Sequence, residues 1–187
     1  MSSPSVVVVI VEDDHHKMLI YRYLRSRGLS SHQITTKLSP SGQGSAEQWI
    51  RTVYATEVRA YRIRHAKATS AQATGLIVMI DADIGTVQNR LKQFMHALEE
   101  SGVPKVEHVE RIALLVPKRN VETWILRLTD CAVNEETNYK RTRHDWHELI
   151  PRASEQLSQW TRPNTALPED CIDSLRRDVS ELNRLQF

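Results

Sequence analysis

Acidic side chains follow two stretches of the sequence that are otherwise apolar. Glu12 comes directly after the run VVVVIV, residues 6–11. Asp81 and Asp83 lie at the end of LIVMIDAD, residues 76–83. Carboxylate oxygens are the ligands that Mg²⁺ prefers, and Mg²⁺ keeps several waters that phosphate oxygens can replace. Carboxylates that gather in one place repel each other unless a cation lies among them, so these residues predict a site for Mg²⁺ or Mn²⁺.

The elements that carry these acids are predicted to be buried parallel strands. Short apolar runs rich in Val and Ile are typical of strands covered on both faces, and open α/β sheets place their chemistry at the carboxyl ends of the strands. Neighbouring strands lie about 4.8 Å apart, so acids at one edge can share an ion. If the second strand continues through Asp83, its alternation directs Asp81 and Asp83 to the same side. Glu12 would then complete the metal ligands or act as a general acid or base.

The rest of the chain alternates between strand and helix patterns. Two more strands are expected at 33–38 and 111–118. Helices are expected at 18–27, 46–65, 86–101 and 121–128, with Gly28 ending the first and Ser45 and Asn120 capping the second and fourth. The pattern predicts an α/β fold with a mainly parallel sheet flanked by helices. Residues 1–128 would form this core, and residues 129–187 a helical extension packed on or beside it.

Composition limits the class of protein. The chain has 187 residues, of which 40% are hydrophobic, and a formal net charge of +2, as expected for one compact α/β domain. Its longest apolar run is too short to cross a membrane, and the first residues lack the basic start of a signal peptide, so we expect a cytoplasmic protein. Cys131 and Cys171 lie in no metal-binding or disulfide spacing.

The acidic motifs resemble those of the TOPRIM family of topoisomerases, primases and OLD-type nucleases. In that family a Glu after the first strand and an Asp-x-Asp after a later strand build the site. VIVE with Glu12 and IDAD with Asp81 and Asp83, followed by Gly85, match this form, whereas Asp13 stands where many members have Gly. The resemblance covers roughly residues 5–125. It implies a TOPRIM-like (Rossmann-like) fold and metal-dependent cleavage of nucleic acid, either DNA or RNA, with Glu12, Asp81 and Asp83 as catalytic residues.

A second segment, PKRNVETW at 117–124, is similar to one in small TOPRIM-like proteins of prokaryotic defence loci. There a Glu follows the last core strand, which makes Glu122 a candidate ligand for a second metal. By the same analogy, a larger ATPase is an expected partner, and the C-terminal helices offer a face for it or for a homo-oligomer.

Basic residues near these acids are candidates for binding phosphate. Lys118 and Arg119 precede Glu122 at the same predicted edge of the sheet. Further along the chain, Arg51, Arg59 and Arg62 can share one face of the helix 46–65 and could follow a nucleic-acid backbone. The preceding loop SPSGQGS, residues 39–45, lacks the Gly-Lys-Ser/Thr ending of a nucleotide-binding P-loop, so we expect a substrate-side loop there.

A different interpretation is a receiver-like or degenerate TOPRIM module that acts as a regulatory or partner-binding protein without nuclease activity. The first strand and helix also resemble a response-regulator receiver, in which Asp13 and Asp14 would bind magnesium, Asp81 would accept a phosphoryl group and Lys118 would contact it. Asp81 follows Asp13 by 68 positions, which is a long separation for so compact a fold. Outside that interpretation, Asp13 and Asp14 are expected as acids at the start of a helix, and the neighbouring His15 and His16 as solvated side chains.

Overall fold

The computed structural model describes residues 6–40, 45–68 and 74–186 and has a four-stranded parallel sheet. The strands are β1 (Val6–Val11), β2 (Ile34–Leu38), β3 (Thr74–Met79) and β4 (Ile112–Leu115), in the order β2-β1-β3-β4. All neighbouring pairs are parallel, so the predicted α/β class is confirmed. Such a sheet flanked by helices is consistent with a Rossmann-like fold.

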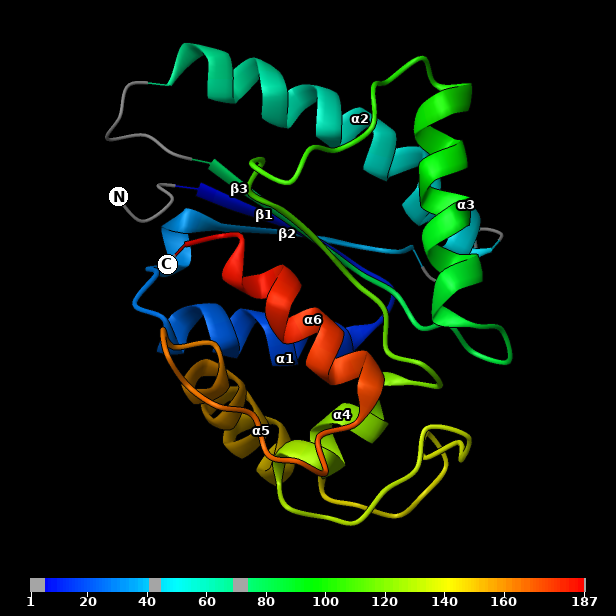
Figure 1. Ribbon diagram of the computed structural model, residues 1–187, viewed down its shortest axis with the longest axis vertical. Helices are drawn as coiled ribbons and strands as arrows, with labels where there is room; N and C mark the ends of the chain where they lie inside the picture. Colours follow the sequence, from blue (N-terminus) through cyan, green and yellow to red (C-terminus); the bar gives the residue numbers. More distant parts are fainter. Residues whose placement is uncertain (1–5, 41–44, 69–73, 187) are drawn as a thin grey trace.

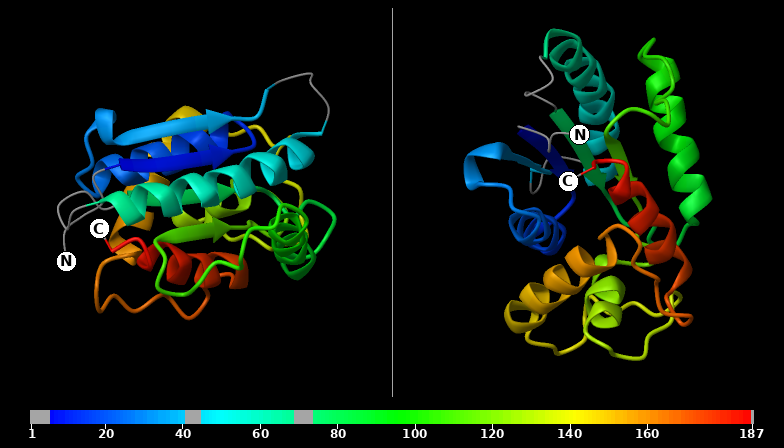
Figure 2. Two further views of the ribbon diagram at one scale, coloured as in Figure 1. Left: turned by 90° about the horizontal axis from the view of Figure 1, so that it is seen from above. Right: turned by 60° about the vertical axis from the view of Figure 1, so that its left-hand side comes forward.

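Helices cover both faces of the sheet (Figures 1 and 2). They are α1 (Asp14–Ser26), α2 (Ala46–Lys67), α3 (Val87–Glu100), α4 (Val121–Leu128), α5 (Trp146–Trp160) and α6 (Asp173–Asn183). Helices α2 and α3 lie on one face, and α1, α4, α5 and α6 lie on the other. The predicted helical segments are therefore present, with ends that shift by a few residues.

The central strand β1 explains why two layers of helices form. Val7, Val9 and Val11 pack into one hydrophobic cluster, while Val8 and Ile10 pack into a second cluster on the opposite face. Each face of a fully apolar strand has to be removed from water, and a layer of helices on each side achieves this.

The C-terminal segment shares the core of the sheet. Leu157 of α5 and Leu175 of α6 belong to the same hydrophobic cluster as Val9. Helix α5 packs against α1 and α4, and α6 packs against β4. The helical extension predicted at 129–187 therefore lies on the core.

Two helix starts behave as their sequences predict, and one does not. Asp13 caps α1 by accepting backbone hydrogen bonds, and Asn120 caps α4 in the same way. Ser45 stands at the start of α2, but its side chain makes no capping hydrogen bond. Gly28 has a φ of 90° after α1, a backbone conformation that favours glycine. Part of the predicted substrate-side loop, residues 41–44, lies outside the described residues.

The end of β3 differs from the expectation. The backbone N–H of Ala82 still donates to Pro117, but Asp83 has a φ of 56° and Gly85 donates back to the carbonyl of Ala82. This turn interrupts the strand alternation immediately after Ala82. The strand therefore does not continue through Asp83, and Asp81 and Asp83 do not occupy equivalent positions.

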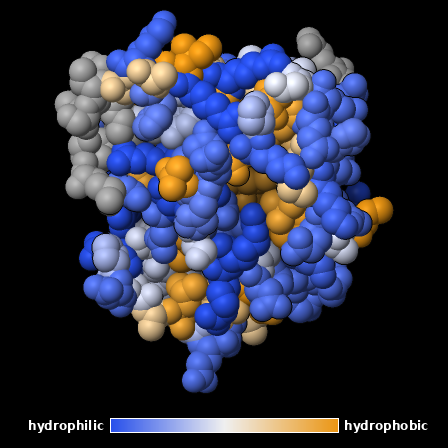
Figure 3. All heavy atoms as spheres, turned by 45° about the horizontal axis from the view of Figure 1, so that its top comes forward, coloured by the Kyte–Doolittle hydropathy of each residue, from blue (hydrophilic) through white to orange (hydrophobic). Residues whose placement is uncertain are grey.

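The surface over α2 and α3 is mostly hydrophilic, with hydrophobic side chains gathered in a central hollow (Figure 3). Phe94, Leu98, Val106 and Leu114 line a pocket of about 290 Å³ next to β4, which is separate from the predicted acidic site. Among the described residues, no helix is both long enough and apolar enough to span a membrane.

A buried acid fastens α6 to the edge strand of the sheet. The Asp178 carboxylate is fully buried, accepts a hydrogen bond from the backbone N–H of Val116 and pairs with Arg177. Burial is the main cause that raises the pKa of Asp178 to about 8, although Arg177 opposes it. Because this pKa is higher in the folded chain than in the unfolded one, folding favours the protonated carboxyl group.

We predict that Asp178 makes the folded protein less stable as pH rises. Its contribution to the free energy of unfolding is highest below the unfolded pKa near 4 and falls until pH passes about 8. Asp178→Asn keeps an oxygen for Val116 and should gain about 1 kcal/mol or more relative to wild type between pH 5 and pH 8. Urea unfolding at both pH values measures this gain. Asp173→Asn, which removes an exposed acid from the same helix, serves as the control, and an equal gain there would contradict the assignment.

Candidate metal centre

Three side chains from separate elements converge at the carboxyl edge of the sheet. Glu12 follows β1, Asp81 follows β3, and His16 lies in the first turn of α1. Each offers one ligand atom, and these atoms all lie within 4.8 Å of one another. The strands β1 and β3 pair with Val11 opposite Met79, which brings the residues after them to the same edge. The backbone N–H of Asp81 also donates to Glu12 Oε2 at 3.4 Å.

His16 is fully buried, so the expectation that it is solvated is wrong. Its Nδ1 lies 2.7 Å from Asp13 Oδ1, and its Nε2 lies 3.0 Å from Asp81 Oδ1. The same Asp13 oxygen accepts the backbone N–H groups of His15 and His16. One aspartate thus starts the helix and fixes the plane of the imidazole. A carboxylate on Nδ1 is the arrangement that leaves Nε2 directed at a metal.

One basic side chain pairs with the buried carboxylate of Asp81, and a second contacts its backbone carbonyl. The Lys140 ammonium lies 2.8 Å from Asp81 Oδ2 and 3.9 Å from Asp13 Oδ2. Arg90, which is also buried, donates from Nε to the Asp81 backbone carbonyl at 3.0 Å and pairs with Glu47 at 2.7 Å. The acids in this structure are therefore neutralised by groups of the chain itself.

The electrostatics of the cluster indicate a place suited to positive charge. Burial, followed by repulsion from Asp81, raises the pKa of Glu12. Burial alone would lower the pKa of His16, but attraction to Asp81 and the hydrogen bond to Asp13 raise it well above its ordinary value. The pKa of Lys140 is raised by Asp81 in the same way, against the effect of burial. Without a metal, the cluster holds its positive charge on His16 and Lys140.

Asp83 lies on the rim of this cluster. Its side chain is 53% exposed and lies 3.9 Å from Arg90. Burial and the nearby Asp81 raise its pKa, which shows that the two acids remain within electrostatic reach. Because the chain turns at Asp83, its carboxylate is not among the three groups that can share one ion. Of the three predicted ligands, the structure brings Glu12 and Asp81 together, and His16 takes the third place.

Glu122 is buried at the start of α4 and interacts with His15. Its Oε1 lies 2.7 Å from His15 Nδ1, and its Oε2 has no hydrogen-bond partner in the described part of the chain. This hydrogen bond is the main cause that raises the pKa of His15. The His15 ring lies 5.5 Å from that of Trp146, between centroids. Glu122 is therefore close to the centre, but it is outside the group of Glu12, His16 and Asp81.

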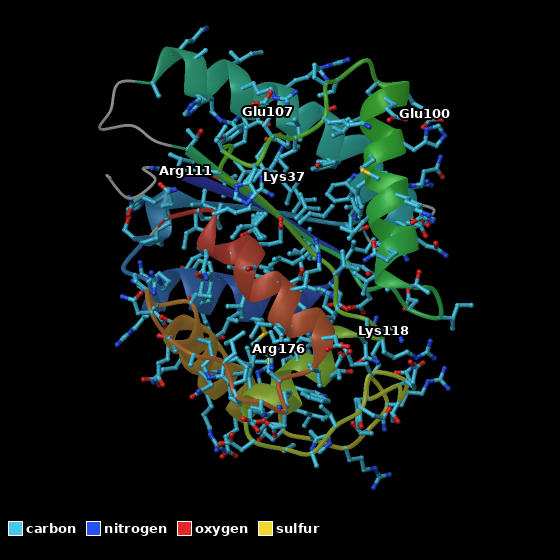
Figure 4. The ribbon with its side chains drawn as sticks, viewed as in Figure 1. Lys37, Glu100, Glu107, Arg111, Lys118 and Arg176 are labelled. Atoms are coloured by element: carbon cyan, nitrogen blue, oxygen red, sulfur yellow. The ribbon has the colours of Figure 1, made fainter. Side chains whose placement is uncertain are left out.

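The predicted phosphate-binding residues fall into two sets. Lys118 and Arg119 follow β4 at the same edge as the acids, and Figure 4 shows Lys118 at the opposite end of the sheet from Arg111. Lys118 pairs with the exposed Glu136. The Nε of Arg119 has no hydrogen-bond partner among the residues described, and Arg119 acts electrostatically on Asp83. This edge therefore retains a donor group beside the acids.

The three arginines of the predicted phosphate track on α2 all make contacts within the chain. Arg62 pairs with Glu110 at 2.7 Å and donates to the carbonyls of Pro104 and Lys105, while Arg59 donates to the carbonyl of Ser101. Arg62 lies about 24 Å along α2 from its start, toward the amino-end edge of the sheet. Arg51, near the start, pairs with Glu47 at 3.6 Å. Arg59 and Arg62 therefore contact the segment after α3, and their role in binding phosphate stays a prediction.

The receiver interpretation requires an acidic pair that the structure does not assemble. Asp13 is directed at His16, whereas the exposed Asp14 pairs with Lys17 at 3.7 Å on the outer side of α1. Lys118 pairs with Glu136, and it is Lys140 that contacts Asp81. This arrangement favours the metal interpretation over a phosphorylation site.

Three residues of the centre were not among the sequence candidates. His16 carried a usable signal, because residues three apart on a helix face the same side and Asp13 precedes it by three. Arg90 and Lys140 carried no such signal, since Arg90 lies in the first turn of the amphipathic helix α3 and Lys140 lies in a polar loop. Their positions depend on tertiary packing.

The donor set suits a divalent cation. Two carboxylates and one imidazole, the latter backed by Asp13, are compatible with Mn²⁺ and also with Mg²⁺, although imidazole is a better ligand for Mn²⁺. Comparisons with protein-family models, with curated proteins and with solved structures found no match to this chain. The TOPRIM resemblance therefore stays a prediction, and the function has to be inferred from the geometry of Glu12, His16 and Asp81.

Proposed function

We propose that the protein is a divalent-metal-dependent nuclease that hydrolyses phosphodiester bonds in nucleic acid. The observation that carries this proposal is the convergence of Glu12, His16 and Asp81 at the carboxyl edge of adjacent strands. The adjacency of β1 and β3 also supports the TOPRIM resemblance, which requires a Glu and an Asp from two such strands to meet.

Each residue of the centre has a distinct role in this proposal. Glu12 and Asp81 would hold the ion through carboxylate oxygens, and His16 would hold it through Nε2 once that nitrogen has released its proton to solvent. Asp13 keeps the His16 ring in place through Nδ1. When bound, the ion polarises a phosphate oxygen and activates a water molecule. Asp83 lies on the exposed side of the centre, where it would bind a water of the ion, and Glu122 stays a candidate ligand for a second ion.

The basic groups around the centre support an anionic substrate. Lys118 and Arg119 lie at the same edge as the acids, and Arg119 acts electrostatically on Asp83. Basic side chains next to a metal stabilise the charge that develops on a phosphodiester during cleavage. The proposal includes a larger ATPase as partner, by analogy with defence-locus proteins, so assays should include any such ATPase encoded nearby.

Addition of Mn²⁺ should stabilise the folded protein, because an ion that binds only the folded state shifts the equilibrium by mass action. At 100 times Kd we expect the Tm to rise by about 5 °C or more. Differential scanning calorimetry measures this rise, and Glu12→Gln and Asp81→Asn should each abolish it. The control Asp14→Asn, which changes an exposed acid outside the centre, should retain it. A rise that survives both Glu12→Gln and Asp81→Asn would place the ion elsewhere.

Loss of a metal ligand should reduce metal-dependent cleavage strongly. Asp81→Asn and Glu12→Gln should each lower the rate on single- or double-stranded substrates by at least about a hundredfold, the scale of losing one main electrostatic stabiliser. Asp83→Asn should have a smaller effect, because Asp83 lies on the rim. The losses of rate caused by Glu12→Gln and Asp81→Asn should not add in the double variant, since Glu12 and Asp81 serve one centre. Cleavage by both single variants at the wild-type rate would refute the nuclease mechanism.

Substitution of Arg119 and substitution of Arg62 should differ in their effect on the affinity for nucleic acid. Arg119→Gln should weaken binding of a nucleic-acid oligomer and reduce the salt dependence of that binding, because one phosphate contact is lost. Arg62→Gln should lower the Tm, since it breaks the contacts to Glu110 and the segment after α3, and should leave binding unchanged. Fluorescence anisotropy over a range of salt concentrations distinguishes the two. If Arg62→Gln weakened binding of the oligomer and Arg119→Gln did not, α2 and not Arg119 would be the site of phosphate contact.

A further inference from the structure

Lys140 stands where a cation would stand in the candidate centre. Its ammonium lies 2.8 Å from Asp81 Oδ2, while Asp81 Oδ1 is taken by His16. Asp81 is one of the three groups that can hold an ion, and an ion bound there would lie within a few ångströms of this ammonium. Two positive charges at such a separation repel each other, more strongly in a buried place than in water.

The segment that carries Lys140 is fixed in place by several specific contacts. This segment, residues 129–145, connects α4 to α5 and is hereafter the strap (Figure 1). Asn138 Oδ1 accepts hydrogen bonds from Asn120 Nδ2 at 3.1 Å and from the backbone N–H of Lys140 at 3.0 Å. Since Asn120 also caps α4, the position of Lys140 is tied to the helix that begins at the edge of the site.

Two further contacts hold the strap. Glu136 pairs with Lys118, next to the end of β4, and Glu135 accepts the backbone N–H of Ser174 in the first turn of α6. The strap is therefore attached to two helices and one strand end. It places the Lys140 ammonium next to Asp81 and Asp13. These contacts show that the Lys140–Asp81 ion pair is a built feature of the fold.

We propose that Lys140 is the internal cation of the metal-free centre and that it competes with the divalent ion for Asp81. This inference rests on the proposed metal centre and adds its regulation. Metal binding displaces the ammonium from Asp81, and the strap keeps it near enough to return when the ion leaves. Lys140 thereby lowers the affinity for metal and keeps the acids compensated until an ion arrives.

Calorimetric titration with Mn²⁺ tests the competition without any activity measurement. Lys140→Met keeps the aliphatic stem and removes the charge, so it should bind Mn²⁺ at least about tenfold more tightly than wild type. Asn138→Ala keeps the charge but frees the strap, and it should tighten binding by a smaller factor. Lys105→Met, which removes a lysine paired with Glu99 away from the site, is the matched control and should bind as wild type does.

The outcomes separate this inference from the proposed function. Equal or weaker Mn²⁺ binding by Lys140→Met, with wild type binding normally, would overturn the competition and leave the metal centre standing. No binding by wild type or by any variant would refute the metal centre and the competition together. Binding by Lys140→Met but not by wild type would support the competition in its strongest form. If Lys140→Met does not fold, Asn138→Ala decides, and unchanged affinity there overturns the inference.

Discussion

The burial of Asp81 beside Glu12 is the constraint on which the rest of the site depends. Glu12 is partly buried and Asp81 is fully buried at one edge of the sheet, and two such carboxylates are unfavourable unless positive charge surrounds them. The chain supplies that charge through His16 of α1 and Lys140 of the strap, while Arg90 of α3 donates to the backbone carbonyl of Asp81. Such a concentration of opposite charges around an acid is unusual for a purely structural feature, since apolar packing would stabilise the same place at lower cost.

The fold positions these groups through its topology. Because β1 is central and pairs with β3, the residues that follow both strands reach the same edge. Asp13 then begins α1 directly after Glu12, so the first helical turn can direct His16 inward. The C-terminal helices contribute as well: α5 packs on α1, and Trp146 at its start contacts the rings of His15 and His144. This packing holds the strap between α4 and α5 over the site.

The sequence predicted the fold better than it predicted the site. Periodicity located the strands and helices because burial on one or two faces leaves a repeating apolar pattern, as in the run from Val6 to Val11. It also located Glu12 and Asp81, because both directly follow such runs. It failed at Asp83, where a turn with positive φ ended the alternation. Arg62 was misjudged because helical spacing alone cannot show that Glu110 and two carbonyls already occupy it.

Lys140 comes from a distant part of the chain, which explains why no local pattern revealed it. Lys140 is far from Asp81 in sequence and meets it only through the strap. A crystal structure of the protein soaked in Mn²⁺, with data that record the anomalous signal of manganese, tests the central claim most directly. The account predicts an anomalous peak bounded by Glu12, His16 Nε2 and Asp81, with the Lys140 ammonium moved away from Asp81. An empty cluster that keeps the Lys140–Asp81 contact in saturating Mn²⁺ would contradict it.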